Sequence, residues 1–336
     1  MQHKISVDAM GGDFGPSVTI PASLKILKKY ENISIVLVGN SDEITKILKK
    51  KKSLNHSRIT IHNATQIVGM DELPQIALKN KKDSSMRVSI NLVKEGVVDA
   101  CVSAGNTGAL MATARFVLRM LPGIDRPAIS TELPNANGTT CMLDLGANAD
   151  CTPEQLLQFG IMGSILTNVL HKKNNPSIGL LSNGSESMKG SEVVKKSAEL
   201  FRNSHLNFHG NVEGDDIFKG TTDVVVCDGF TGNISLKTTE GLAQMMANFL
   251  TLEFKRNFLT KISALIALPV LKRFKKRLDP RRYNGASFLG LNGIVVKSHG
   301  GADEFAFIHA LETTISESEN DVISKIKDQL KVESIT

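Results

Sequence analysis

Residues 223–241 limit the folds open to this 336-residue chain more than any other segment. They begin with Val224, Val225 and Val226, a β-branched run typical of a strand buried on both faces. Asp228 and Gly229 end the run, and apolar residues at helical spacing follow. A buried strand, a Gly-rich turn and a helix predict a parallel α/β sheet, in which ligands bind where the strands end. The other interpretation is an ordinary turn whose Asp and Asn side chains only cap the helix.

Similar corners recur near residues 11, 105, 184 and 300. Each joins an apolar strand pattern to a Gly-rich turn that carries Asp, Asn, Ser or Thr. Such turns direct free backbone N–H groups, and often a helix dipole, at the space beyond the strand. One corner alone is weak support for a site, but five together predict a polar crevice that binds an anion.

The order of patterns predicts the fold class. Short apolar strands alternate with helical patterns, which predicts a doubly wound, mostly parallel, Rossmann-like sheet in a single α/β domain of residues 1–336. Residues 128–133 and 139–145 flank Asn137 and Gly138, and this pattern predicts an antiparallel hairpin added to the sheet as a flap. Such flaps often serve dimers.

The positive charge of the chain lies almost entirely in residues 253–282. The net charge is +6, yet this segment carries +8 and the remainder −2. Apolar residues at helical spacing flank Pro269, which predicts an amphipathic helical hairpin insert over about 242–282, its two helices meeting at the Pro. Its apolar side either packs on the body or another subunit, or faces an anionic partner such as a membrane surface. The basic residues proposed for that partner are Lys255, Arg256, Lys261, Lys272, Arg273, Lys275, Lys276 and Arg277.

Several classes of chemistry lack their motifs in this sequence. There is no GxSxG, no GxxxxGK[ST], no HExxH and no Cys–His cluster, so we predict no metal and no cofactor. The four Cys residues suit reduced thiols in a cytosolic protein, and no signal peptide or nucleic-acid motif is evident. The remaining chemistry is direct attack of a bound anion, such as phosphate, on an activated acyl group.

Eight ordered motifs resemble those of the bacterial phosphate acyltransferases (the PlsX family) along nearly the whole chain. They are DAMGGDFGP, SAGNTGAL, LDLGANADC, GSESMKG, VEGDDI, CDGFTGNISLKTTEG, YNGASFLGLNG and VKSHGGAD. The resemblance implies an enzyme that converts acyl-acyl carrier protein and inorganic phosphate into acyl phosphate for glycerol-3-phosphate acylation in phospholipid synthesis. It also implies a homodimer with an isocitrate dehydrogenase- and phosphotransacetylase-like sheet, loosely held at the membrane. A membrane glycerol-3-phosphate acyltransferase would then be a further partner.

The motifs also supply candidate site residues. Lys189 is predicted to neutralise phosphate, Asp228 to orient the reactants or accept a proton, Asn233 to donate a hydrogen bond, and His299 to protonate the leaving thiol. The predicted substrate-binding residues are Gly11, Gly12, Asp13, Gly105, Asn106, Thr107, Gly108, Asn148, Glu186, Gly229, Thr231 and Gly232.

Two positions depart from the family pattern. Asp215 stands where relatives often carry Arg, which removes a predicted phosphate contact, and Ser287 stands where Pro is common, a change expected to matter little. Three other functions stay open: a phosphotransacetylase that uses acyl-CoA, a dehydrogenase of the same fold class, and a non-catalytic membrane-surface adaptor built on residues 253–282.

Overall fold

The computed structural model describes residues 2–333, apart from the side chains of Lys275, Leu278 and residues 331–333. Its strands are β1 (His3–Asp8), β2 (Ile33–Gly39), β3 (Ile59–Asn63), β4 (Ala100–Ser103), β5 (Ala128–Pro134), β6 (Thr139–Leu143), β7 (Ile178–Leu181), β8 (Phe208–Val212), β9 (Val224–Val226), β10 (Ala286–Leu289) and β11 (Ile294–Lys297). Its α-helices are α1 (Pro16–Lys29), α2 (Ser41–Lys50), α3 (Pro74–Asn80), α4 (Ser85–Lys94), α5 (Thr107–Leu118), α6 (Pro153–His171), α7 (Glu192–Arg202), α8 (Asp216–Lys219), α9 (Gly229–Lys255), α10 (Phe258–Leu278), α11 (Glu304–Glu319) and α12 (Val322–Glu333). A 3₁₀ turn, η1, spans Pro280–Tyr283.

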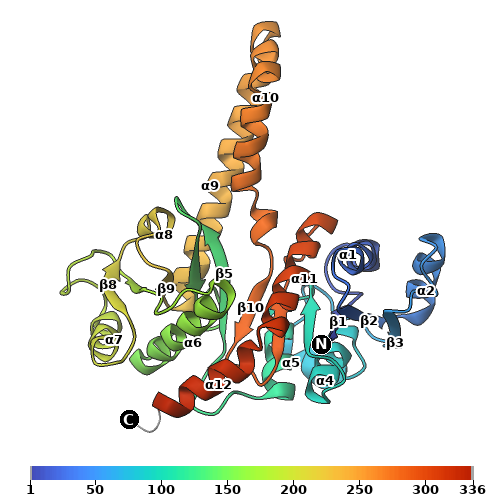
Figure 1. Ribbon diagram of the computed structural model, residues 1–336, viewed down its shortest axis with the longest axis horizontal. Coiled ribbons are helices and arrows are strands. Elements are labelled where there is room, and N and C mark those ends of the chain that lie inside the picture. The colour runs from blue at the N-terminus through green and yellow to red at the C-terminus, as the bar shows by residue number, and fades with distance from the viewer. Residues whose placement is uncertain (1, 334–336) are drawn as a thin grey trace.

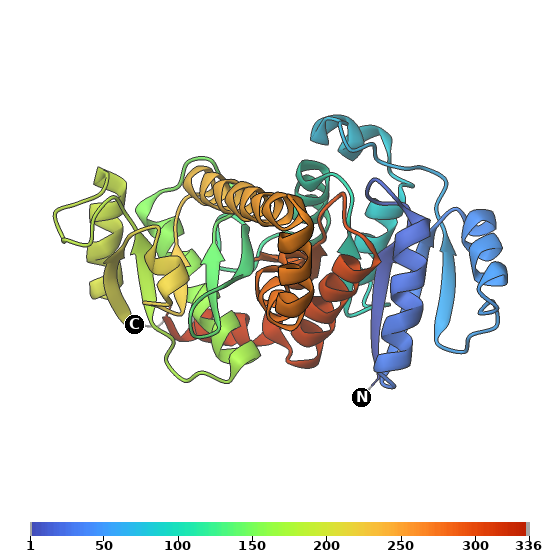
Figure 2. The same cartoon turned by 90° about the horizontal axis from the view of Figure 1, so that it is seen from above.

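All eleven strands belong to one sheet in the order β3-β2-β1-β4-β11-β10-β5-β6-β9-β7-β8. β3, β2, β1, β4 and β11 are mutually parallel, as are β6, β9, β7 and β8. The pairings β11–β10, β10–β5 and β5–β6 are antiparallel. The predicted α/β sheet is therefore present, with two parallel groups joined by an antiparallel centre. Figure 2 shows the N-terminal elements at one end, the green and yellow elements at the other, and the C-terminal segments between them.

The three antiparallel pairings reverse the second parallel group relative to the first. The right-handed twist of a sheet turns neighbouring strands by about 20–25°. Over the seven pairings from β1 to β7 this amounts to roughly 140–175°, which nearly cancels the reversal. The carboxyl ends of both groups therefore point in broadly the same direction.

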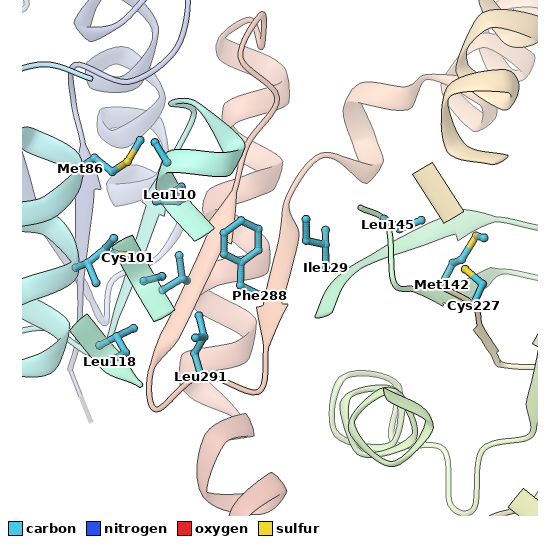
Figure 3. Packing of buried hydrophobic residues seen from close by; sticks show 14 of the residues in the cluster. Met86, Cys101, Leu110, Leu118, Ile129, Met142, Leu145, Cys227, Phe288 and Leu291 are labelled. Atoms are coloured by element: carbon cyan, nitrogen blue, oxygen red, sulfur yellow. The ribbon is translucent and has the colours of Figure 1, made fainter. Parts of the chain in front are cut away.

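One hydrophobic cluster runs along the same face of both groups. It includes Cys101 of β4, Phe288 of β10, Ile129 of β5, Met142 of β6 and Cys227 beyond β9 (Figure 3). Phe288 lies in the middle of this row and is almost fully buried. The two halves thus share a continuous core, which holds the loops at their strand ends in fixed relation.

The predicted hairpin of residues 128–133 and 139–145 forms as β5 and β6, but not as a flap. β5 pairs with β10 and β6 pairs with β9, so both strands lie inside the sheet. The prediction of an added flap is wrong because the partners of a strand depend on distant segments, here β9 and β10. These strands connect the two halves.

The basic segment forms a helical hairpin, as predicted, but the turn lies elsewhere. α9 ends at Lys255 and α10 begins at Phe258, while Pro269 lies inside α10. The Asn257 side chain accepts from Thr260 N–H, and the Thr260 hydroxyl accepts from Asn257 N–H, so a capping box starts the second helix there. Pro269 removes one helical hydrogen bond without ending the helix. The hairpin projects from the body (Figure 1), so its apolar side does not pack on it.

Candidate active site

Three adjacent parallel strands end in polar side chains on one face of the sheet. Asp8 ends β1, Ser103 ends β4 and Lys297 ends β11. Lys297 is the register partner of Ser103, and the Ser103 hydroxyl donates to Asp8 Oδ2 at 2.6 Å. All three side chains are buried. Burial raises the pKa of Asp8 above its ordinary value.

The glycines beyond these strands allow the loops to close over them. A Cβ on Gly11 would lie 2.5 Å from Asp8 Oδ2, and one on Gly12, whose φ is +87°, would lie 2.9 Å from Gly300 O. Asp13 N–H donates to the same Gly300 carbonyl at 2.9 Å. The predicted corners at residues 11, 105 and 300 therefore meet, with the exposed Asp13 at their rim.

Asn106 holds the second corner together. Its Oδ1 accepts from Ala109 N–H at 2.9 Å and caps α5, while its Nδ2 donates to the carbonyls of Met70 and Glu72. Both amide hydrogens are thus engaged within the protein. Thr107 and Gly108 open α5 and are exposed, and their N–H groups have no hydrogen-bond partner in the part of the chain that the structure describes. These N–H groups, rather than the Asn106 amide, are free to bind an anion.

The second half has its own polar centre at Asp144, which follows β6. Its Oδ1 accepts from the N–H groups of Ile129, Gly146 and Ala147, and its Oδ2 accepts from Asn148 N and Nδ2. Asn148 is buried and also donates to Pro127 O. Gly229 N–H in turn donates to Asn148 O at 2.8 Å. The Asp144–Asn148 pair therefore shapes the loop and sets the position of α9.

The start of α9 packs directly on that loop. Asp228 caps the helix, since its Oδ1 accepts from Thr231 N–H and its Oδ2 from the Thr231 hydroxyl, both at 2.8 Å. A Cβ on Gly232 would lie 1.9 Å from Asp144 O, so this position accepts only glycine. Asn233 is exposed, and its side chain lies beside Gly146. Asp228, Thr231, Gly232 and Asn233 are thus brought together at one helix start.

Two lysines connect the halves. Lys297 has its pKa lowered to about 8, chiefly by burial, while Asp13 and Asp8 act in the opposite sense and the Lys237 charge on α9 adds to the lowering. Leu236, next to Lys237, packs against the cluster that contains Val295 of β11. The charge of Lys237 on α9 therefore acts on a strand end of the first half.

The loop of residues 182–190 borders the second half. Gly190 N–H donates to Asn183 Oδ1, and Lys189 is exposed, with its aliphatic stem against Gly184. Glu186 is exposed and its carbonyl accepts from the Asn211 amide. An open pocket of about 500 Å³ lies beside this loop and is mainly apolar in lining: Ala149, Asp150, Cys151, Leu156, Leu180, Leu181, Ser191, Val193, Val194, Cys227, Asp228, Phe230 and Thr231.

His299 lies at the rim of the first half. Its backbone N–H donates to Asn284 Oδ1, and its ring Nδ1 accepts from the backbone N–H of Gly301 at 3.1 Å. This bond leaves the Nε2 hydrogen on an exposed ring. Asp215, in contrast, pairs with Lys219 at 2.7 Å beside the short helix α8.

Four buried residues of these corners were not singled out from the sequence: Asp8, Ser103, Asp144 and Lys297. The available signal was position, because each is a polar residue at or next to the end of an apolar strand. Lys297 was the clearest case, since it closes the run Ile294–Lys297. Among the described residues, no group of three or more His, Cys, Asp or Glu is arranged to hold a metal ion.

A family model described as "Fatty acid synthesis protein" matches residues 3–325. The chain belongs to this family. A relative from Chromobacterium violaceum named phosphate acyltransferase is 63% identical over 98% of this chain and 96% of its own length. Another of that name, from Paraburkholderia phytofirmans, is 54% identical over 97% of this chain and 89% of its own. The predicted family and the prediction of an enzyme are confirmed.

Solved structures with a similar fold support the predicted architecture. A phosphotransacetylase from Streptococcus pyogenes superposes with a TM-score of 0.66 at 17% identity, covering 95% of this chain and 94% of that one. A branched-chain phosphotransacylase from Enterococcus faecalis V583 gives 0.59 at 12% identity, covering 94% and 99%. The predicted Rossmann-like, phosphotransacetylase-like fold of this fatty acid synthesis protein family member is thereby confirmed.

Proposed function

We propose that this protein is a phosphate acyltransferase that forms acyl phosphate from acyl-acyl carrier protein and inorganic phosphate. The name of the relatives at 54–63% identity supports the acyl transfer to phosphate. The observation that carries the proposal is the meeting of three polar strand ends, where the buried ammonium of Lys297 lies beside the free N–H groups that open α5.

The reaction requires one bond exchange. A phosphate oxygen attacks the thioester carbonyl, a C–O bond forms, the C–S bond breaks, and the phosphate proton passes to the thiolate of the carrier. The site binds an anion and stabilises the oxyanion by N–H groups, which suits this chemistry. Lys189 would neutralise the phosphate or the transition state, and Asn233 would donate to the thioester oxygen. His299 would protonate the leaving thiol from its exposed Nε2.

The hydrogen bonds of Asp228 favour one of its two proposed roles. Both carboxylate oxygens are held by Thr231, so Asp228 fixes the start of α9 rather than standing free as a base. The adjacent apolar pocket, with Leu180, Val193 and Phe230 in its wall, would receive the acyl chain next to the thioester.

The base of the hairpin is the proposed dock for the acidic carrier protein or an anionic membrane surface. An open pocket of about 700 Å³ is lined there by Val270, Arg273, Phe274, Lys276, Arg277, Arg282 and Tyr283. The outer faces of α9 and α10 expose large apolar side chains, among them Phe249, Leu252, Leu265 and Ile266. In the described part of the chain, no helix is long and apolar enough to cross a membrane. A peripheral position on the cytoplasmic side of the membrane, a homodimer, and delivery of the product to a membrane glycerol-3-phosphate acyltransferase complete the proposal.

The proposed role of Lys189 is tested by steady-state formation of acyl phosphate. Lys189→Ala is expected to lower kcat/KM for phosphate by about 10²-fold, as expected when a charge contact to the transition state is lost. Lys196→Ala, a lysine on the neighbouring helix α7, is the matched control. Unchanged turnover and phosphate KM in Lys189→Ala would remove Lys189 from the mechanism.

A further inference from the structure

Lys297 is a buried cation without a carboxylate partner. Only 8% of the residue is exposed, and no carboxylate oxygen of the described residues lies within 4.0 Å of its Nζ. Its ammonium donates to two backbone carbonyls, those of Ala104 at 3.5 Å and Ser298. An ammonium has three donors, so one remains for a ligand. A buried charge with only neutral acceptors is costly, and an anion would compensate it.

The surroundings of Lys297 are those of an anion site. The Ala104 carbonyl that it contacts belongs to the turn before α5, where the N–H groups of Thr107 and Gly108 stand free. Lys237 of α9 is near enough for its charge to act on Lys297, but its Nζ is paired with Glu240 Oε2 at 2.7 Å. Lys297 and the start of α5 thus lie close together, although they come from segments far apart in the sequence.

The negative groups nearby define the limits of that space. Asp8 is one strand beyond Ser103, at about 9–10 Å in backbone spacing from β11, and it is engaged with Ser103. Asp13 lies at the exposed rim. Neither neutralises Lys297 directly, so the Lys297 charge remains available to a bound oxyanion.

We propose that Lys297 binds inorganic phosphate at the base of its subsite, beside the free N–H groups that open α5. The choice of phosphate as the ligand rests on the proposed function. The binding site itself should hold phosphate with or without an acyl donor. Lys297 contacts phosphate in this assignment and is therefore a catalytic residue.

The test is calorimetric titration of the full chain with inorganic phosphate at pH 7. Lys297→Met, which keeps the length of the stem and removes the charge, should weaken binding by at least tenfold. Lys94→Met, at the exposed C-terminal end of α4, is the matched control and should bind as the unaltered protein does. Unchanged phosphate affinity in Lys297→Met would overturn the proposal.

A second measurement starts from the unaltered protein. Phosphate dianion bound at Lys297 should raise the proton affinity of its amine, so binding at pH 8.5 should take up part of one proton. Titrations in two buffers of different ionisation enthalpy measure this uptake. Absence of uptake in the unaltered protein, or the same uptake in a folded Lys297→Met, would overturn the assignment.

The two proposals fail in different ways. If the protein binds phosphate through Lys297 but forms no acyl phosphate from any thioester, the function is wrong and the subsite stands. If it forms acyl phosphate while Lys297→Met binds phosphate normally, the subsite is wrong and the function stands.

Discussion

At the scale of single residues, the buried Lys297 should destabilise the fold near neutral pH. Its pKa of about 8 in the folded protein lies below the ordinary 10.5, so the protonated form favours unfolding. The penalty is fully present below pH 8 and disappears as the pH rises to 10.5. Asp8, Asp13 and Lys237 are the charges that face it. Lys297→Met should therefore raise the free energy of unfolding at pH 7 by about 3 kcal/mol.

Urea unfolding of both proteins between pH 7 and pH 10 checks this prediction. The difference in free energy of unfolding should shrink above pH 8. A Lys297→Met protein that is less stable than the parent at pH 7 would show that the ammonium supports the fold rather than a ligand.

Glu317 of α11 is a buried acid that contacts β10. The Ser287 hydroxyl of β10 donates to it, so the serine at this position has a structural partner that a proline could not supply. Burial raises the pKa of Glu317 to about 7, against an ordinary 4.5.

The sign of this effect follows from linkage. The folded protein binds the Glu317 proton more tightly, so stability should fall as the pH rises from 4.5 to 7 and stay reduced above 7. Glu317→Gln should be more stable than the parent at pH 8 by about 3 kcal/mol and equal to it near pH 4.5. Denaturant melts at both pH values test this. Parallel pH profiles for the two proteins would contradict it.

At the scale of elements, the position of α9 depends on one glycine. Gly232→Ala places a methyl group against the Asp144 carbonyl, so the helix start must move. We expect a loss of about 1–3 kcal/mol in stability, together with a raised phosphate KM, because the corner of residues 228–233 shifts. The control is Gly241→Ala in the same helix, where a Cβ meets nothing within 4 Å. That change should stabilise the protein by about 0.5–1 kcal/mol.

Thermal unfolding and the phosphate KM are measured for both glycine variants. The comparison separates the effect of steric crowding at Gly232 from the general effect of alanine on helix stability. Equal effects of the two substitutions would show that the close approach at Gly232 does not position the helix.

The sequence predicted local elements better than their partners. The strand at Val224–Val226 and the helical hairpin of the basic segment follow from local patterns and are confirmed. The placement of β5 and β6 inside the sheet depends on pairing with β10 and β9, which no local pattern encodes. At the hairpin, Pro269 was the stronger sequence signal, yet the capping box at Asn257 decided the turn.

The site shows the same division. Turn glycines and cap residues such as Asp228 are visible in the sequence because they follow strand patterns. Asp8, Asp144 and Lys297 depend on burial and on neighbours from other strands, which only the fold brings together. The meeting of the corners at residues 11, 105 and 300 depends on the pairing of β1, β4 and β11.

At the scale of the whole molecule, the charge of the hairpin predicts how the enzyme meets its acidic partner. Neutralising Lys272, Arg273, Lys275 and Lys276 to Gln should weaken binding to anionic vesicles or carrier protein at least tenfold, with the larger loss at low salt. The matched control neutralises the run of lysines at residues 49–52, at the end of α2. Vesicle flotation and carrier-protein titration at two salt concentrations measure the effect. Equal binding by both variants would show that the basic segment is only a solvated surface.

The central claim is transfer of an acyl group from the carrier protein to phosphate. It is tested most directly by mixing the purified protein with palmitoyl-acyl carrier protein and labelled inorganic phosphate, with palmitoyl-CoA in a parallel reaction, and measuring labelled acyl phosphate. The account predicts acyl phosphate from the carrier-protein thioester and little or none from the CoA thioester. Product from CoA alone would indicate a phosphotransacetylase, and no product from either donor would contradict the account and favour a membrane-surface adaptor.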